Sequence, residues 1–489
     1  MNTTEGLAPL CRVLRISLCR VAIGMCFTEN VKQRGVPRMG GRLRGTLVFG
    51  FSDWFCDSLR AFWRVFCPPK FFLTLCDKFG MYIWGMEQIL IRNFGPIVNN
   101  GATSISLSKV LLLCGEQGTG KSTIAKLISQ FSWLEKALVR KDYSVSDVEQ
   151  SGFFVKLSSF HNIVSYFKPN TSIKFSGTKF DFLYENHVLK VVEKTVGEYI
   201  RPQIMYIPAE RNLAAALEDA PIIQNLPKPI AVFLEEYYNA LKNIKAPFKL
   251  PLNGYKVNYD DKSSTVWFGD DDFKIKLSEA ASGFQSLVPL VLVSANLLLR
   301  VKLHTDSSSS RSEASLAESL RFEKTIRDIL NNETLDEKVR VFMIKELNKS
   351  IRNNRLLNVV EEPEQNLHPT SQRVVLNELL RINNSIAQNQ LVMTTHSPYI
   401  INYLTLAIKA GILVSKFGAD KAALLDDVVP LKSSVLPEDV SIYQISTDGE
   451  IEILDKYDGI PADSNLLNDA LGKTNDLFDK LLEIEDSLA

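Results

Sequence analysis

The chain has 489 residues, of which 45% are hydrophobic and 23% charged, a composition typical of globular proteins with room for two or three compact units. Its 56 Lys and Arg residues balance its 56 Asp and Glu residues. This balance excludes a chain-wide basic field for nucleic acid, so any such contact would need a local basic patch.

Residues 1–85 differ from the rest of the sequence. They carry 12 Lys and Arg residues and 5 Asp and Glu residues, and they hold six of the seven cysteines. Residues 86–489 carry the remaining 44 basic and 51 acidic residues. No C-x-x-C spacing indicates zinc, no apolar core of signal-peptide length follows the first arginines, and charges interrupt every apolar run before membrane-spanning length. We expect an atypical extension, disordered or mis-started, with Met86 opening the folded protein, and no membrane contact.

A phosphate-binding loop is predicted early in the remaining chain. Residues 86–98 predict a strand that closes in a Gly-Pro turn, and the apolar run 111–114 leads into the pattern G-x-x-x-x-G-K-S. In this P-loop pattern the glycines let backbone N–H groups point at phosphate oxygens, Lys121 reaches the β- and γ-phosphates, and Ser122 binds Mg²⁺. Apolar residues at helical spacing follow over 124–131. The predicted nucleotide-binding residues are Gly115, Glu116, Gln117, Gly118, Thr119, Gly120, Lys121, Ser122 and Thr123.

The middle of the chain predicts antiparallel strands and then helices. The predicted elements are hairpins between 140 and 200, a buried strand with a polar turn over 203–212, a helix over 228–245, strands at 254–259, 264–268 and 272–277, and an apolar helix over 287–300. A Ser-rich linker at 304–312 and a charged helical stretch over 314–351 follow.

A second acidic motif follows the linker. The apolar strand 356–360 ends in Glu361 and Glu362, and a P-loop enzyme needs such a strand beside its P-loop strand. Glu361 fits the Mg²⁺ shell, through a bound water, and Glu362 fits the general base that deprotonates the attacking water. The alternative is a strand that simply runs out into a polar loop.

The chain then alternates helix 370–382, strand 391–395 and helix 398–408, the mark of a parallel α/β sheet. A hairpin around Asp448-Gly449 and an acidic helix over 465–487 complete it.

These motifs carry a family resemblance. The block Glu361-Glu-Pro-Glu-Gln-Asn-Leu-His-Pro369 resembles the Walker B and D-loop block of ABC-type, AAA-family ATPases of the SMC/RecF/OLD group. The segment 391–398 resembles their switch strand, which implies that His396 contacts the γ-phosphate. The segment 277–285 resembles their signature motif in its S-G-x-Q form, and segments 91–97 and 206–211 also resemble parts of these proteins. Taken singly, His396 could be a turn residue and Ser282 an N-cap, but their order and spacing favour the functional interpretation.

The resemblance implies a P-loop NTPase of ABC head type, an α/β fold with a mixed or parallel central sheet, an antiparallel β subdomain and a helical insertion. The implied division is an ATPase N-lobe at 86–300, a linker and charged helical insertion at 301–350, an ATPase C-lobe at 351–410, and a C-terminal hairpin and helix at 411–489. Ser282, Gly283 and Gln285 are implied to act in trans on the ATP held by a second subunit. The acidic residue for the metal is Glu361, where many relatives use Asp. Gln130 and Gln150 are both candidates for the Q-loop. Arg211 is a candidate for a position near phosphate.

The implied function is a cytoplasmic, dimeric or larger ATPase that uses ATP and Mg²⁺ as a switch. Relatives of this kind act in DNA maintenance or in defence against phage, often with a nuclease, and the chain is similar in outline to the PtuA ATPases of Septu-type systems. We see no Toprim nuclease motif after residue 404, so a nuclease partner would be a separate protein, and DNA is a further candidate partner. The alternatives are a transporter ATPase subunit and a regulatory module that holds ATP with little turnover.

Overall fold

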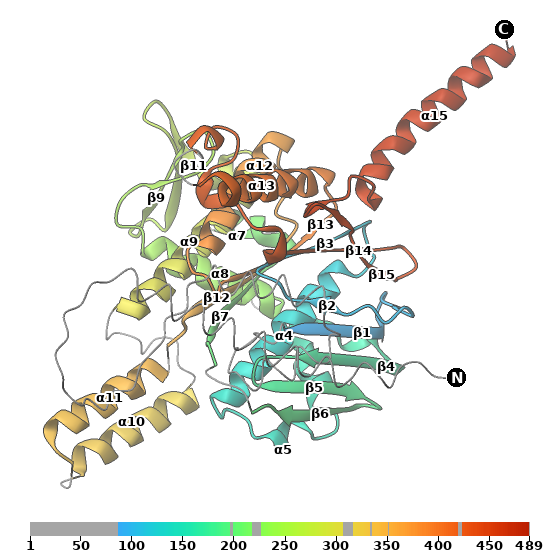
Figure 1. The fold of residues 1–489 in the computed structure, drawn as a ribbon. Coiled ribbons are helices and arrows are strands. Elements are labelled where there is room, and N and C mark those ends of the chain that lie inside the picture. The colour runs from blue at the N-terminus through green and yellow to red at the C-terminus, as the bar shows by residue number, and fades with distance from the viewer. Residues whose placement is uncertain are drawn as a thin grey trace, which may run out of the picture. The chain divides into compact units, whose positions relative to one another are not determined.

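The structure is a computed structural model and describes residues 87–195, 199–217, 226–306, 316–332, 335–350, 352–418 and 423–488 (Figure 1). The predicted extension at 1–85 and the proposed start at Met86 lie outside the described residues.

A six-stranded mixed sheet forms the centre of the described chain. In spatial order its strands are β15 (Ile451–Ile453), β14 (Val440–Ile445), β3 (Val110–Gly115), β13 (Gln390–Thr395), β12 (Arg355–Glu361) and β7 (Pro202–Ile207). All neighbours pair in parallel except β15, which is antiparallel to β14. The predicted α/β class with a mixed, mostly parallel sheet is confirmed.

One expectation about this sheet is wrong. The acidic strand β12 does not lie beside the P-loop strand β3, because β13 pairs with both and separates them. In this register Glu361 is level with Thr394, and Thr395 is level with Cys114. Since the carboxyl ends of parallel strands share one edge, the loops after β3, β12 and β13 still meet there.

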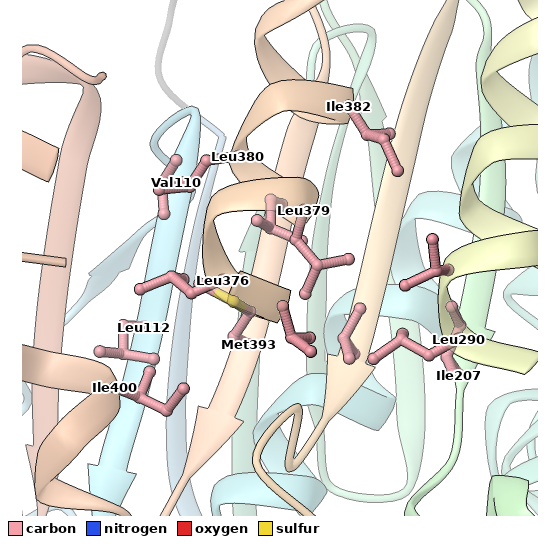
Figure 2. Close-up of a cluster of buried hydrophobic side chains, with 14 of the residues drawn as sticks. Val110, Leu112, Ile207, Leu290, Leu376, Leu379, Leu380, Ile382, Met393 and Ile400 are labelled. Atoms are coloured by element: carbon pink, nitrogen blue, oxygen red, sulfur yellow. The ribbon is translucent and has the colours of Figure 1, made fainter. Parts of the chain in front are cut away.

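The two faces of the sheet have separate cores because side chains alternate along β3. Val110, Leu112 and Cys114 belong to a core shared with helices, part of which Figure 2 shows. These helices are α8 (Lys228–Lys242), α9 (Ser282–Asp306), α12 (Pro369–Asn384) and α13 (Pro398–Phe417). Leu111 and Leu113 face the opposite core, which holds α4 (Lys121–Val139) and an antiparallel sheet.

That antiparallel sheet has five strands in the order β2 (Ile105–Ser106), β1 (Gln88–Phe94), β4 (Phe167–Ser176), β5 (Phe180–Glu185) and β6 (Val188–Glu193). A second antiparallel sheet has the order β11 (Lys274–Lys276), β10 (Thr265–Gly269), β9 (Lys256–Asp260) and β8 (Phe248–Lys249), and β16 (Lys456–Tyr457) pairs with β17 (Ile460–Pro461). The predicted antiparallel β portion is therefore confirmed, and it comes from two stretches of sequence.

The helical insertion consists of two helices, α10 (Leu316–Asn331) and α11 (Glu337–Ser350). The linker expected over 304–312 is wrong at its start, because α9 continues to Asp306, and residues 307–315 lie outside the described chain. The remaining short helices are α5 (Val145–Val148), α6 (Phe153–Leu157) and α7 (Leu213–Ala216), with single-turn helices at Ser158–His161, Val164–Tyr166, Ala209–Asn212, Leu277–Glu279, Ala423–Leu425, Leu431–Ser433 and Pro437–Asp439.

The C-terminal segment contributes to the central sheet. Strand β14, from the predicted 411–489 segment, pairs along the whole length of β3, and the hairpin at Asp448-Gly449 joins it to β15. The last helix, α15 (Leu466–Leu488), extends away from this sheet (Figure 1).

Two described helices are long and apolar enough to cross a membrane, Ser282–Leu303 within α9 and α13. Each packs one apolar face against the central sheet, and the apolar window is 72% buried in α9 and 39% buried in α13.

Candidate active site

The predicted P-loop connects β3 to α4 and is shaped by its glycines. Gly115 has φ +149°, and a Cβ placed on it would lie 2.3 Å from the Ile445 carbonyl oxygen of the neighbouring strand β14. Only glycine therefore fits where the loop leaves the sheet. Glu116, Gln117 and Gly118 are exposed at the loop's tip, whereas Thr119, Gly120, Lys121 and Thr123 are buried and Ser122 is half-buried. The tip is the part of the loop that a ligand can reach.

Lys121, the first residue of α4, folds back over the loop. Its Nζ donates hydrogen bonds to the carbonyl oxygens of Gly115 at 2.9 Å and Glu116 at 2.6 Å. Burial lowers the pKa of this ammonium group, and the Glu362 carboxylate acts in the opposite direction. The cation is thus held inside the concave loop, at the N-terminal end of a long helix, where both the charge and the helix dipole favour an anion.

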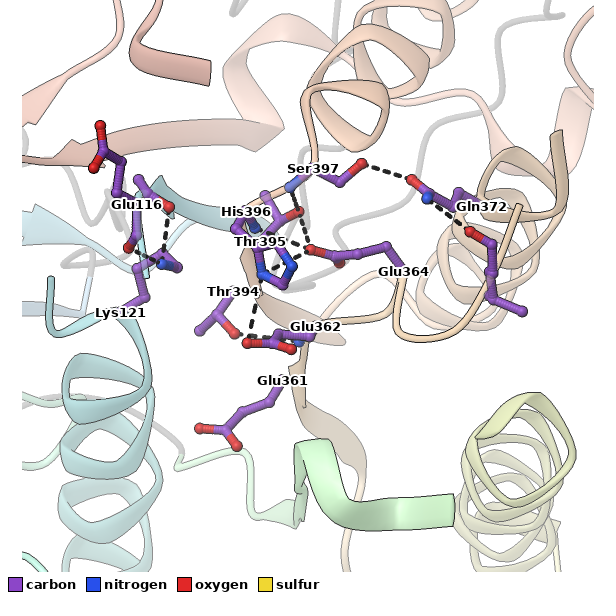
Figure 3. Close-up of polar contacts among 12 residues, drawn as sticks. Glu116, Lys121, Glu361, Glu362, Glu364, Gln372, Thr394, Thr395, His396 and Ser397 are labelled. Carbon is purple, nitrogen blue, oxygen red and sulfur yellow. Dashed lines mark hydrogen bonds and ion pairs between the residues drawn. The ribbon is translucent and has the colours of Figure 1, made fainter. Parts of the chain in front are cut away.

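Glu361 lies at the end of β12 and is suited to a metal. Its side chain is buried, and one carboxylate oxygen, Oε2, accepts a hydrogen bond from the Ala209 N–H at 3.2 Å. The other oxygen, Oε1, is buried and has no hydrogen-bond partner among the described residues. Figure 3 shows this side chain on the side of the sheet where Lys121 opens its helix. A buried, half-satisfied carboxylate is the donor that a hard cation such as Mg²⁺ uses, so the residues fit the implied metal.

Glu362 and His396 form a pair at the same sheet edge. The Glu362 Oε1 atom lies 3.5 Å from Nδ1 of His396, which follows β13. The contact with His396 lowers the pKa of the Glu362 carboxyl, and the same contact raises the pKa of His396. Glu362 is therefore ionised at neutral pH and available as a proton acceptor.

Glu364 is a member of this site that the sequence analysis missed. Its buried Oε1 accepts hydrogen bonds from the Thr395 hydroxyl at 2.7 Å and from the His396 N–H at 2.9 Å, and it lies 3.6 Å from His396 Nδ1 (Figure 3). Burial raises the pKa of the Glu364 carboxyl. Glu364 thus ties the turn after β12 to the end of β13. A third acidic residue after the Pro was the only sequence signal for it.

Arg211 forms hydrogen bonds with the backbone at the acidic end of β12. Its guanidinium is 1% exposed and donates to the backbone oxygens of Glu361 at 2.7 Å and Glu362 at 2.6 Å. Burial lowers its pKa to about 10. The guanidinium binds two carbonyl groups inside the protein, and a position of Arg211 near phosphate stays a prediction.

The signature segment lies away from the P-loop. Ser282 begins α9 and is exposed, and α9 packs in the core on the opposite face of the sheet from α4. Gly283 abuts the turn after β12, since a Cβ there would lie 2.8 Å from the Asn366 carbonyl oxygen. Gln285 donates to the carbonyl oxygens of Ser278 and Ala280 at 2.9 and 2.8 Å, so its amide closes a loop of its own chain.

The two Q-loop candidates also lie apart from the phosphate loop. Gln130 is buried within α4, where its Nε2 donates to the Ser158 hydroxyl at 2.8 Å, and Gln150 is exposed in the turn after α5. Nine residues of helix separate Gln130 from Lys121, about 13 Å along the axis. Among the described residues, neither glutamine side chain forms a hydrogen bond with the phosphate loop.

Comparison with known proteins gives matches of limited extent. Residues 337–401 match the model of the AAA ATPase domain family, a range that contains Glu361, Glu362, Glu364 and His396 but not the P-loop. No curated protein matches the chain.

Three solved structures illustrate the similarity to known folds. The SMC head domain from Thermotoga maritima is 11% identical, with a TM-score of 0.32, covering 76% of this chain and 99% of that one. The Smc head domain with an extended coiled coil from Pyrococcus furiosus is 10% identical, with a TM-score of 0.32 and coverage of 81% and 99%. The recombination mediator RecF is 13% identical, with a TM-score of 0.24 and coverage of 76% and 99%. At such TM-scores the likeness supports no inference about the site, whereas the family match connects the strand ends β12 and β13 with ATPase domains.

Proposed function

We propose that this protein binds and hydrolyses ATP with Mg²⁺ and works as a dimeric switch. The observation that carries the proposal is the convergence of the P-loop lysine, the Glu362–His396 pair and the buried carboxylate of Glu361 at one edge of the central sheet. A phosphate cradle, a metal ligand and a general base are the parts that phosphoryl transfer to water requires.

Each residue has a role that follows from its position. Lys121 exchanges its two loop carbonyl partners for phosphate oxygens, while Ser122 and Glu361 hold the metal, Glu361 through a bound water. When bound, Mg²⁺ neutralises charge on the phosphates. Glu362 accepts a proton from the attacking water, and His396 contacts the terminal phosphate.

The dimer is proposed because, among the described residues, the signature segment and α4 lie on opposite faces of the central sheet. Ser282 and the N-terminus of α9 form an exposed group on the other face of the sheet, at a position where a second subunit could use them. In a two-fold dimer each protomer would complete the ATP site of its partner.

Mixing two inactive variants tests the shared site. Lys121→Ala removes the cis cradle, and Ser282→Arg blocks the trans contribution. In a dimer of one of each, one of the two sites has an intact P-loop facing an intact Ser282. An equal mixture should regain about a quarter of wild-type ATPase, since half of the dimers are mixed and each has one working site. A mixture as inactive as its components would contradict the shared site, and an active Ser282→Arg protein alone would assign the whole site to one chain.

The switch is proposed to act in the cytoplasm on DNA-related or anti-phage processes, with a separate effector such as a nuclease. ATPase rates with and without duplex DNA, and co-purification of a nuclease from the native host, test this part. Co-purification of a membrane permease would instead favour a transporter subunit.

A further inference from the structure

A cavity of about 740 Å³ lies next to the C-terminal half of α4, apart from the phosphate loop. It is bounded by residues of α4, the Ser158–His161 turn, β7, α8 and α9. Trp133 in its wall follows Lys121 by twelve helical residues, about 18 Å along the axis. The cavity is therefore separate from the P-loop, and its volume is that of a small-molecule site.

The lining of the cavity is strongly basic. It contains five cations and a single acid, Glu236, although residues 86–489 have seven more acidic than basic residues. The cations are Lys136, Arg140, Lys156, Lys228 and Arg300. A surplus of positive charge around one cavity, in a sequence whose residues 86–489 are acidic on balance, favours an anionic ligand there.

Two of these cationic side chains have no hydrogen bond or ion pair within the described chain. Arg300 pairs with Glu236 at 2.5 Å, Arg140 pairs with Asp142 at 2.7 Å, and Lys136 Nζ donates to the Pro202 carbonyl oxygen at 2.7 Å. Lys156 and Lys228 are exposed in the lining, and their side chains have no hydrogen bond or ion pair with any described residue. Their ammonium groups are free to bind phosphate.

Aromatic rings form one wall of the same cavity. Trp133 and Tyr143 are each 36% exposed, with ring centroids 6.3 Å apart, and Phe153 lies 5.2 Å from Tyr143. Exposed aromatic faces beside lysines are the combination that proteins use to stack a nucleobase and hold its phosphate.

Two polar side chains of the lining have buried atoms that lack partners. Gln130 and His161 are at most 4% exposed, and Oε1 of Gln130 and Nδ1 of His161 are buried without a hydrogen bond among the described residues. Burial lowers the pKa of His161 to about 3, so the ring is neutral and offers one donor and one acceptor nitrogen. Both atoms are closed to solvent, so a ligand in the cavity would not contact them in this conformation.

We propose that this cavity binds a mononucleotide, with its ring against Trp133 and Tyr143 and its phosphate on Lys156 and Lys228. The volume of the cavity favours a small ligand over an extended nucleic-acid strand. This proposal does not depend on ATP hydrolysis at the P-loop.

The test measures binding of AMP, GMP, CMP and UMP by calorimetry. All proteins carry Lys121→Ala, so that the P-loop contributes little. At least one nucleotide should bind with 1:1 stoichiometry, and Lys156→Glu with Lys228→Glu should weaken it about tenfold or more, since each charge-assisted contact is worth about a factor of ten. The matched control, Lys249→Glu with Lys262→Glu, reverses two exposed lysines of the four-stranded sheet and its turn, and should bind like the parent.

Three results would overturn the proposal. The first is that none of the four nucleotides binds at about 1 mM, a concentration that corresponds to a binding free energy of only about 4 kcal/mol. The second is equal binding by the Lys156→Glu, Lys228→Glu variant and by its control. The third is binding of a twenty-residue oligothymidylate without binding of any mononucleotide. The last result would assign the cavity to nucleic acid. Urea unfolding of each variant confirms that a loss of binding is not a loss of fold.

Discussion

Glu364 offers the sharpest test of the site, because one carboxylate oxygen holds two strands' ends together. Its Oε1 accepts hydrogen bonds from the Thr395 hydroxyl and the His396 N–H, and Thr395 is fully buried. Replacement by Ala leaves both donors without an acceptor. A buried donor that loses its partner costs about 1–3 kcal/mol, so the loss of two partners in Glu364→Ala should lower the free energy of unfolding by about 2–6 kcal/mol.

Glu364→Gln separates hydrogen bonding from charge. The amide oxygen of Gln can accept both hydrogen bonds, and its NH₂ replaces Oε2, which has no partner among the described residues. We therefore expect Glu364→Gln to retain most of the stability that Glu364→Ala loses. It also removes an acidic group 3.6 Å from His396 Nδ1, so the pKa of His396 should fall.

Urea unfolding and ATPase kinetics measure both consequences. Glu364→Ala should lower kcat about tenfold or more, as expected when the backbone of a group at the reaction centre is displaced, while ATP binding at the P-loop changes little. NMR titration of the five histidines follows the pKa of His396 directly. The reasoning is refuted if Gln and Ala destabilise equally, or if Glu364→Ala unfolds at the wild-type urea concentration.

Three further predictions concern the neighbouring groups. Glu362→Gln should bind ATP like the wild type and hydrolyse it at least about tenfold more slowly, since it removes the proposed general base; unchanged turnover would exclude Glu362 from the reaction. Arg211→Met should lower the free energy of unfolding by about 3 kcal/mol, because two buried carbonyl groups lose a charged donor, and wild-type stability in urea would contradict that role. The Glu362–His396 pair should stabilise the fold most between about pH 4.5 and 6.5, the ordinary pKa values of the two groups. The raised pKa of His396 means that its contribution is lost as pH rises through that pKa, and the lowered pKa of Glu362 means that its contribution is lost as pH falls through it. Unfolding of His396→Ala should differ from wild type by about 1 kcal/mol or less in this window, and by less at pH 9; a difference that grows toward pH 9 would contradict the assignment.

Local patterns in the sequence predicted most elements of the fold. The apolar runs at 356–360 and 391–395 became β12 and β13, and the charged stretch 314–351 became α10 and α11. The hydrophobic periodicity and the turn residues that define these elements lie within short stretches of sequence, so the sequence alone was enough to predict them.

Long-range pairing and burial were not predictable in the same way. The position of β13 between β3 and β12, and the pairing of β14 with β3, depend on contacts between residues hundreds of positions apart. Glu364 and Arg211 stand in polar turns of the sequence, where charged residues are normally solvated, and only the fold shows that both are buried.

The backbone at Glu362 links these buried groups to the proposed chemistry. Glu362 has φ +43°, a conformation that costs a residue with a side chain about 1 kcal/mol or more. Its N–H donates to the Thr394 carbonyl oxygen at 3.0 Å, and its own carbonyl oxygen accepts from Arg211 at 2.6 Å. The strained residue is thus fixed on both sides of its Cα.

A base fixed in this way does not need to be positioned by nucleotide binding. Its side chain already contacts His396, whose N–H is in turn held by Glu364. If the cis half of the site is preset, the step that remains is completion of the phosphate site from outside, which we propose comes from Ser282 of a second chain. On this view variants of Arg211 and Glu364 should slow hydrolysis at the site of their own chain, whereas Ser282→Arg should slow hydrolysis at the site of the partner chain that it faces.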